Sequence, residues 1–359
     1  NVYSPSNYPA ANNSSFDGYA INSKETKNLT KKKFEKFKIL KIIAAGDNPN
    51  IKKIPKHSTI EVMTGAIIQK PFDTIIPIEQ IYFFPNKSNA EYIILKNKLK
   101  KNEYIRPAGS DFKKGDKIVK KGQFINSTHL LAFKTLGIEK VLVKKKPKLV
   151  FYPTGNELSE IKKIPNWKIR NSNTSYLENY IKNLPVNFKV NKILRDNQSV
   201  NFKKEIIKNM NSRSDIVITS GAVSAGKFDF IPKIIKKFKI KNMFKGVAIR
   251  PGKPIMFAKF NNNMCFFGLP GNPISSAACF RFFVFPFLQE SLGIQEEKPL
   301  KAVLRNKFIK KLNFTRFIKC KINTTKNSKI FVEILKGQES FRIKSFVKSN
   351  IWVLLPAGK

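Results

Sequence analysis

The chain has 359 residues, 42% hydrophobic and 12% aromatic, so it can bury several cores and is not a disordered protein. Basic residues outnumber acidic ones by 68 to 24, but the excess is spread evenly and is mostly lysine. This pattern favours a compositional bias over a specific nucleic-acid site, while the charge can attract anionic substrates. No apolar run is long enough for a membrane span. The three cysteines lack metal-type spacing and indicate a reduced, cytoplasmic setting.

The first part of the chain, to about residue 147, is predicted to be rich in β-structure. Short alternating or apolar segments at 59–63, 74–78 and 91–95 are separated by Gly, Pro and Asn. Asn126 and the two residues after it offer caps for a helix over 129–136, which Gly137 ends. His129 lies near that helix start and is interpreted as structural. A short strand is expected at 140–143.

From residue 148 the pattern changes to alternating strands and helices. Strands are expected at 149–152, 189–194, 215–219 and 264–267, with helices at 175–183, 200–210 and after residue 273. Such alternation predicts a parallel, doubly wound sheet that binds ligands at the carboxyl ends of its strands. After about residue 298, short strands at 330–335 and 352–355 predict a small β domain.

Three loops follow these strands and could bind an anion. They are 219–226, 251–254 and 269–273. Gly221 and Gly226 would let backbone N–H groups approach a phosphate, although a plain tight turn is equally compatible. Lys253 could reach the same crevice or be a solvated lysine. Ser275 and Ser276 stand at an expected helix start, where hydroxyls cap free amides or receive a phosphate.

Carboxylates on comparable turns suggest a cation site. They are Glu157, Asp196 and Asp229, with Asp17 and Asp111 in the first part. Oxygen ligands of this kind suit Mg²⁺ bound through phosphate oxygens, although solvation or helix capping explains each one alone. Neither the two histidines nor the cysteines are paired as in a zinc or nucleophile site.

Taken in order, several motifs resemble one family. They are Asn13 to Ala20 (NSSFDGYA), Met63 to Ala66 (MTGA), Arg106 to Asp111 (RPAGSD), Thr154 to Leu158 (TGNEL), Asn171 to Asn173, Arg195 with Asp196, and the three loops above. Together they span essentially the whole chain. They resemble the molybdopterin molybdenumtransferases, the MoeA and gephyrin E-domain family.

The resemblance implies a multidomain α/β fold. Its central three-layer α/β domain has a parallel-type sheet and is shared with molybdopterin adenylyltransferases; a β-rich N-terminal region and a small C-terminal β domain flank it. The implied boundaries are 1–12 with 103–147 for a composite N-terminal domain, 13–102 for a β-rich inserted domain, 148–297 for the molybdopterin-binding domain and 298–359 for an incomplete C-terminal domain. Relative to the family, the chain lacks residues at both ends. Members are homodimers whose site lies between two subunits, which would give Asp17 a role.

The implied reaction takes adenylated molybdopterin and molybdate, with Mg²⁺, and yields molybdenum cofactor and AMP. A molybdopterin adenylyltransferase is an implied partner. The catalytic residues implied by similarity are Asp17, Glu157, Asp229 and Lys253, and the metal ligands are Glu157, Asp196 and Asp229. The implied substrate-binding residues are Thr64, Gly221, Ser224, Gly226, Arg250, Gly252, Pro270, Gly271, Asn272, Ser275 and Arg316.

Three departures from the family pattern leave alternatives open. Ala222 replaces the second glycine of a pair, Asn156 replaces an aspartate, and Gly246 stands where many members have lysine. A scaffold that binds the pterin nucleotide without turnover is therefore one alternative. A molybdopterin adenylyltransferase is another, although the flanking regions argue against it. Neither molybdenum nor tungsten is singled out by the residues.

Overall fold

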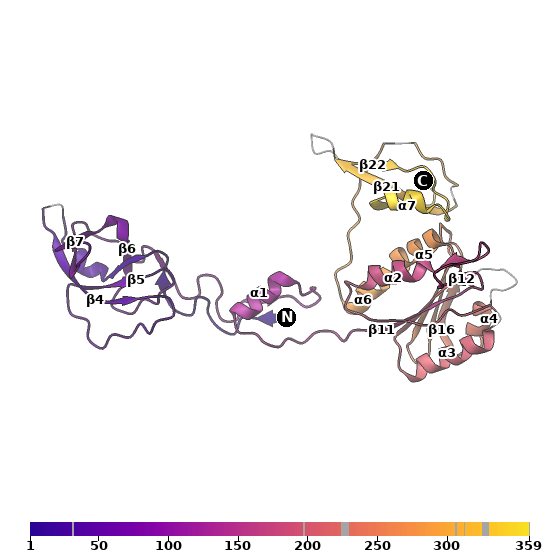
Figure 1. Cartoon of the computed structure of the whole chain (residues 1–359), viewed down its shortest axis with the longest axis horizontal. Coiled ribbons are helices and arrows are strands. Elements are labelled where there is room, and N and C mark those ends of the chain that lie inside the picture. Colours follow the sequence, from indigo (N-terminus) through magenta and orange to yellow (C-terminus); the bar gives the residue numbers. More distant parts are fainter. Residues whose placement is uncertain are drawn as a thin grey trace. The chain divides into compact units, whose positions relative to one another are not determined.

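The computed structural model describes residues 1–30, 32–196, 198–223, 230–305, 307–311, 313–324 and 330–358. Ser224, Gly226 and Asp229 therefore lie outside the described residues. The chain divides into two compact units, residues 1–142 and 143–359 (Figure 1). Within the described residues, every helix is too short or too polar to cross a membrane.

The first unit is built around a six-stranded sheet with the order β6-β3-β5-β4-β8-β7. Its strands are β3 Gly18–Ile21, β4 Glu35–Ile43, β5 Ser58–Val62, β6 Thr74–Pro77, β7 Tyr82–Phe84 and β8 Tyr92–Leu95. Short 3-10 helices lie at Ser23–Thr26 and Ile78–Gln80. Two apolar clusters, one around Ile60 and one around Phe37, bury the strands. The predicted strands at 59–63, 74–78 and 91–95 are confirmed as β5, β6 and β8.

Two short ladders and one helix complete the first unit. β1 Val2–Tyr3 pairs with β10 Lys117–Val119, and β2 Asn13–Ser14 pairs with β9 Ile105–Arg106. Helix α1 spans Ser127–Thr135. The Asn126 side chain accepts a hydrogen bond from the His129 N–H, and His129 Nδ1 accepts one from the Asn126 N–H. This reciprocal cap confirms the predicted helix and the structural role of His129.

The expected strand at 140–143 is wrong. These residues pair with no strand of the described chain, and Leu142 and Val143 are exposed. An apolar pair forms a strand only where a sheet edge offers it a hydrogen-bonding partner, and here none does.

A six-stranded sheet forms the centre of the second unit, with the order β14-β11-β15-β19-β18-β16. Its strands are β11 Lys148–Pro153, β14 Asn187–Val190, β15 Ile216–Ser220, β16 Ile240–Lys245, β18 Met256–Phe260 and β19 Cys265–Leu269. Four strands are parallel as predicted, but β18 runs antiparallel to both of its neighbours, β19 and β16. The connection from β18 to β19 is too short for a crossover, so these two strands must form a hairpin.

Helices cover both faces of this sheet and give three layers (Figure 1). On one face lie α2 Ser172–Ile181, α5 Pro273–Cys279, the π-helical turn Phe280–Val284 and α6 Phe285–Leu292; on the other lie α3 Ser199–Asn211 and α4 Ile231–Ile235. Successive β15 residues face opposite layers: Ile216 and Ile218 pack against the first group, Val217 against the second. This alternation confirms the three-layer α/β class.

A five-stranded sheet and one helix form the end of the second unit. The elements are β17 Ile249–Arg250, β20 Val303–Leu304, β21 Thr315–Thr324, β22 Ile330–Ile334, α7 Ile343–Lys348 and β23 Ile351–Leu355. β17 comes from the segment between β16 and β18, and it pairs in parallel with the start of β21. The Phe317 ring stacks on Phe282 with centroids 3.9 Å apart, which joins this sheet to the π-helical turn. Between β11 and α2 in the sequence, β12 Leu158–Ser159 and β13 Ile169–Arg170 form a two-stranded parallel ladder.

Candidate functional site

Three loops meet at the carboxyl edge of the central sheet. Thr154 donates from its N–H and its hydroxyl to the Ser220 carbonyl, at 3.0 and 2.7 Å. The Gly221 N–H donates to the Leu269 carbonyl at 2.8 Å. Gly221 has a φ of +103°, and a Cβ there would lie 2.6 Å from the Thr154 carbonyl oxygen, so only glycine fits. The loops after β11, β15 and β19 therefore form one surface, as parallel strands require.

The loop after β11 is tied to the loop after β14. The Asn156 N–H donates to Asp196 Oδ2 at 3.3 Å, and the Asp196 N–H donates to Asn156 Oδ1 at 3.1 Å. The Arg195 guanidinium also donates to the carbonyls of Gly155 and Leu158, at 3.1 and 2.8 Å. The Glu157 carboxylate folds over Gly155, where a side chain would collide with it. Two exposed or half-exposed carboxylates, Glu157 and Asp196, thus share this pair of loops.

These two loops fit one mode of magnesium binding. Mg²⁺ is commonly held by one or two carboxylates together with the phosphates of a substrate. Glu157 and Asp196 supply oxygen ligands of that type. Within the described residues, no three His, Cys, Asp or Glu side chains gather into a closed metal cage.

Basic side chains gather around Phe314 in the second unit. β17 places Arg250 beside Arg316 in the parallel register, and the Arg250 guanidinium lies 4.8 Å from the centre of the Phe314 ring. The Lys253 ammonium lies 5.9 Å from the same ring. We call Arg250, Lys253 and Arg316 the cationic cluster.

The cationic cluster carries uncompensated charge. Burial, and then the nearby Arg250, lower the pKa of Arg316 from its ordinary value. The Arg316 Nε atom is buried and has no hydrogen-bond partner among the described residues. The ion pairs in the described part of the chain join Arg281 to Glu297 and Arg342 to Glu339, away from the cluster. Two adjacent guanidinium groups that have no counter-ion among the described residues can attract an anion.

The turn that carries Lys253 packs against α5. Gly252 has a φ of +107°, and a Cβ there would lie 2.5 Å from Cys279 Sγ. The Cys279 thiol contacts the Gly252 carbonyl oxygen at 3.5 Å. This close approach fixes the turn on the helix and leaves Lys253 exposed. Helix α5 therefore links the cationic cluster to the loop that precedes it, Pro270 to Asn272.

That loop is held from both sides. On one side the Asn173 side chain of α2 donates to the Gly271 carbonyl at 2.9 Å. On the other, the Ile274 N–H donates to the Ser340 carbonyl at 3.3 Å, and Asn272 Nδ2 lies 3.4 Å from Ser340 Oγ. The capping interpretation of Ser275 and Ser276 is wrong, because α5 starts at Pro273 and both serines are buried within it.

In the first unit, two predicted residues meet. Thr64 donates from its N–H and its hydroxyl to Asp17 Oδ1, at 2.7 and 2.9 Å. These bonds, the backbone one first, lower the pKa of Asp17, so its carboxylate is ionised at neutral pH. Both residues are exposed. Asp111 lies elsewhere, with Arg106 and Ser110, on the wall of a cavity of about 590 Å³.

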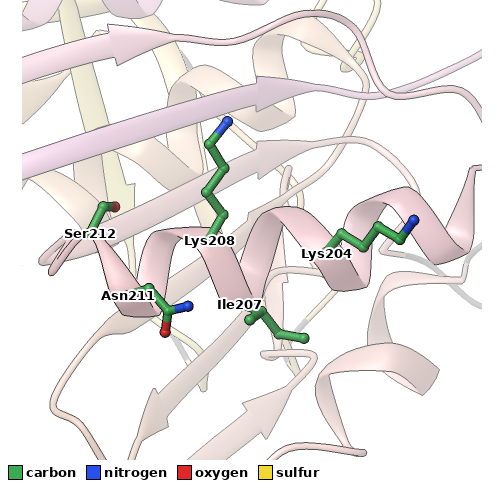
Figure 2. A pocket seen from close by; sticks show the side chains of 5 residues that line it. All are labelled: Lys204, Ile207, Lys208, Asn211 and Ser212. Atoms are coloured by element: carbon green, nitrogen blue, oxygen red, sulfur yellow. The ribbon is translucent and has the colours of Figure 1, made fainter.

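A hollow of about 530 Å³ on α3 lies outside the site. Lys204, Ile207 and Lys208 line it, with two residues at the end of the helix (Figure 2). One of these, Ser212, accepts a hydrogen bond from Lys148 Nζ at 3.3 Å. Lys148 is the first residue of β11, so the end of the hollow lies at the amino edge of the sheet, opposite Thr154.

Comparisons with known proteins decide the family. Residues 1–137 match the model of the MoeA N-terminal region (domain I and II), and residues 151–290 match that of the "Probable molybdopterin binding domain". Molybdopterin molybdenumtransferases of Staphylococcus aureus and Staphylococcus epidermidis are 32% identical over 354 residues, covering 98% of this chain and 82% of theirs. The chain belongs to the molybdopterin molybdenumtransferase family. The resemblance predicted from the motifs is confirmed.

Solved structures agree with this molybdopterin molybdenumtransferase assignment. A molybdopterin biosynthesis MoeA protein from Pyrococcus horikoshii has a TM-score of 0.81 and 26% identity, covering 99% of this chain and 85% of its own. A molybdenum cofactor biosynthesis protein from Pyrococcus furiosus, with a TM-score of 0.51 and 23% identity, covers 70% of this chain and 80% of its own, and it shares the fold.

Sequence reasoning missed three contacts of the site. Phe314 was not singled out, although Arg250 and Lys253 both lie against its ring. The contact of Ser340 with Asn272 spans 68 positions and depends on the fold. Lys319 was not singled out in a lysine-rich chain, although it is buried. None of these contacts has a local sequence signal.

Proposed function

We propose that the chain inserts molybdenum into adenylated molybdopterin and releases AMP. The observation that carries this proposal is the joint geometry of the second unit. A glycine-lined sheet edge with two carboxylates, Glu157 and Asp196, is connected through α5 to a cationic cluster that forms no ion pair within the described part of the chain. An anionic pterin nucleotide and an oxyanion are the ligands that such an arrangement would bind.

Molybdate would bind at the cationic cluster. Its tetrahedral oxygens suit the forked donors of Arg316 and Arg250, and Arg316 Nε would gain the acceptor that it lacks. Lys253, exposed on its rigid turn, would neutralise the phosphate charge of the nucleotide. Because the two adjacent guanidinium groups repel each other, binding a dianion would relieve that repulsion as well as form new hydrogen bonds.

The pterin nucleotide would lie along the sheet edge. Gly221, Pro270 and Gly271 shape that edge, and Asn173 fixes the Gly271 carbonyl. Glu157 and Asp196 would hold Mg²⁺ through substrate phosphate oxygens; the ion, when bound, withdraws charge from the phosphoanhydride and eases release of AMP. Ser224, Gly226 and Asp229 belong to the same proposal by their place in the sequence.

Asp17 and Thr64 would complete the site from the first unit of a second copy. The lowered pKa of Asp17 supports a charged role there, since an ionised, exposed carboxylate can bind a cation or orient a proton donor. A homodimer in the cytoplasm, supplied with adenylated molybdopterin by an adenylyltransferase, follows from this proposal. The match of residues 1–137 to the MoeA N-terminal region argues against the chain itself being that adenylyltransferase.

AMP release from adenylated molybdopterin, with Mg²⁺ and with or without molybdate, tests the proposal. Molybdate-dependent release is expected from the wild-type protein, and loss of about two orders of magnitude from Arg316→Ala and Asp229→Asn. Lys208→Ala, which removes a cation from the α3 hollow, is the control and should retain full activity.

Two other outcomes are informative. Tight binding of the nucleotide without AMP release would instead establish the scaffold alternative and direct attention to Ala222 and Asn156. Absence of both binding and release, in a folded protein that elutes as a dimer, would overturn the proposed function.

A further inference from the structure

Lys319 places an ammonium group inside the C-terminal sheet region. Only 1% of the residue is exposed. Its Nζ atom lies 2.8 Å from the carbonyl oxygen of Gly337, 3.2 Å from that of Glu339 and 3.1 Å from that of Arg342. A lysine ammonium has three donors, so the three carbonyls can satisfy all of them.

All three acceptors belong to one loop, Gly337 to Arg342, which we call the clamp loop. The backbone of Lys319 is bound to the same loop, because Gln338 Oε1 accepts from its N–H and Gln338 Nε2 donates to its carbonyl, at 2.9 and 2.8 Å. The single hydroxyl proton of Ser345 is shared between the carbonyls of Gly337 and Arg342, which lie 2.6 and 3.0 Å from Oγ. Desolvation lowers the pKa of Lys319 from its ordinary value.

Burial makes the arrangement rigid. A buried ammonium that loses its acceptors cannot be resolvated without opening the structure, so the clamp loop is held in the one conformation that points its carbonyls at Nζ. The acceptors are backbone oxygens and not a carboxylate. The lysine therefore fixes the path of the chain and not the orientation of a single side chain.

The clamp loop contacts the Pro270 to Asn272 loop and the start of α5 through Ser340. The Ser340 carbonyl accepts from the Ile274 N–H, and its hydroxyl lies 3.4 Å from Asn272 Nδ2. Asn272 ends the Pro270 to Asn272 loop, which is held on its other side by Asn173. Ser340 is therefore the second of two supports of that loop, and Lys319 determines where Ser340 stands.

We propose that Lys319 is a positioning residue for the pterin-nucleotide site, acting through the clamp loop on Asn272. This inference rests on the proposed function, because it assigns Lys319 to the same site. Removing the amine leaves the chemistry intact but frees the clamp loop, so Ser340 no longer holds Asn272. Binding of the nucleotide must then also order this loop, so the affinity for the nucleotide falls. The value of kcat at saturation is unchanged.

The test compares Lys319→Met with the wild-type protein. Methionine is unbranched and fills a similar apolar path without the amine. The dissociation constant of adenylated molybdopterin, measured by titration of intrinsic fluorescence, should rise about tenfold, with kcat at saturation within about twofold. Hydrogen exchange should quicken in residues 337–342 and 270–276. Lys321→Met, on the same strand but exposed, is the matched control and should change neither quantity.

A double-mutant cycle separates positioning from general destabilisation. If Lys319 acts through Asn272, then Lys319→Met adds little to the binding loss of Asn272→Ala, whereas independent effects would multiply. Should Lys319→Met fail to fold, Ser345→Ala takes its place, because it loosens the same loop by removing only one hydroxyl donor.

The contrary outcomes are distinct. A folded Lys319→Met protein that binds the nucleotide as tightly as wild type overturns the positioning role, whether or not its clamp loop exchanges faster. Multiplicative effects in the cycle overturn it too. Failure of the wild-type protein to bind the nucleotide at all is recognised separately, because it refutes the proposed function and this inference with it.

Discussion

Thr64 donates two hydrogen bonds to a single oxygen atom of Asp17, across 47 positions of the chain. Both bonds end on Oδ1, and among the described residues no donor contacts Oδ2. One oxygen is thereby fixed in place while the other faces solvent. The pair thus presents an ionised carboxylate with a defined direction, which a flexible surface aspartate would not do.

Thr64→Val tests this arrangement by removing the hydroxyl and keeping the N–H. The pKa of Asp17 should rise part of the way to its ordinary value, because one of the two bonds that favour the carboxylate is lost. In the wild-type protein the lowered pKa of Asp17 stabilises the folded state at pH values above the ordinary aspartate pKa. This stabilisation is lost as the pH falls through the lowered pKa. Carboxyl NMR titration of both proteins measures the change; an unaltered Asp17 titration would mean that the hydroxyl bond is not formed in solution.

Ala222→Gly is expected to stabilise the protein. Ala222 has a φ of +55°, in the left-handed region where a Cβ costs about 1–2 kcal/mol. Glycine relieves that cost but loses more entropy on folding, leaving a net gain of about 0.5–1 kcal/mol. Urea denaturation gives the value. Ala278→Gly, in buried α5, should destabilise by about 1 kcal/mol or more, and the same sign in both variants would contradict the argument.

Asn156→Asp should make the protein more dependent on Mg²⁺. The new carboxylate can still accept from the Asp196 N–H, but it adds a third negative charge beside Glu157 and Asp196. Without the ion, the melting temperature should fall; with Mg²⁺ it should recover, so the metal-induced shift grows. Differential scanning calorimetry with and without Mg²⁺ measures this. Asn211→Asp, exposed at the end of α3, serves as the control.

Phe314→Leu should weaken molybdate binding without unfolding the site. The Phe314 ring lies under Arg250 and near Lys253, and each such contact contributes about 0.5–1 kcal/mol. Leucine keeps the apolar volume but not the ring, so the KM for molybdate should rise about threefold to tenfold. Phe331→Leu removes a similar contact, with Arg305, outside the cationic cluster. Equal KM values in both variants would refute an ordering role for Phe314.

The three cysteines should resist thiol reagents in the native protein. Burial raises the pKa of Cys320 to about 12 and also raises those of Cys265 and Cys279. At pH values between the ordinary and the raised thiol pKa, the native state therefore binds more protons than the unfolded chain. The free energy of unfolding falls as the pH rises above the ordinary thiol pKa. Labelling with an aromatic disulfide at pH 8 should be slow and should follow unfolding in urea. Rapid labelling of any thiol under native conditions would show that its burial is incomplete.

Local patterns predicted most of the central sheet and little of the cationic cluster. The apolar segments at 149–152, 215–219 and 264–267 became β11, β15 and β19 because buried parallel strands leave a continuous hydrophobic signal. Strands β16 and β18 were not predicted. β16 lies at the edge of the sheet and none of its residues is fully buried, so it carries no continuous apolar signal. β18 is short and its buried positions alternate with half-buried ones. Capping at Asn126 was readable because it involves neighbours in sequence.

The site divides in the same way. Gly221, Asn156 and Asp196 follow strands, so their meeting at one edge was implied by a parallel sheet. The pairing of Arg250 with Arg316 was not, because β17 leaves the sheet of its neighbours in sequence and joins another. The buried amine of Lys319 could not be distinguished from solvated lysines by composition. Its acceptors are backbone atoms, which any sequence supplies.

The pairing of β17 with the C-terminal sheet also limits which segments can be recombined between relatives of this chain. Ile249 and Arg250 are encoded between two strands of the central sheet, yet their hydrogen bonds complete the sheet formed after residue 300. In a chimera that takes only the segment after residue 300 from a relative, β17 would pair with a different strand sequence. The register that places Arg250 beside Arg316 would then be lost. Recombination within this family should therefore keep β17 and the segment after residue 300 from the same parent, although more than fifty residues separate β17 from β21 in the sequence.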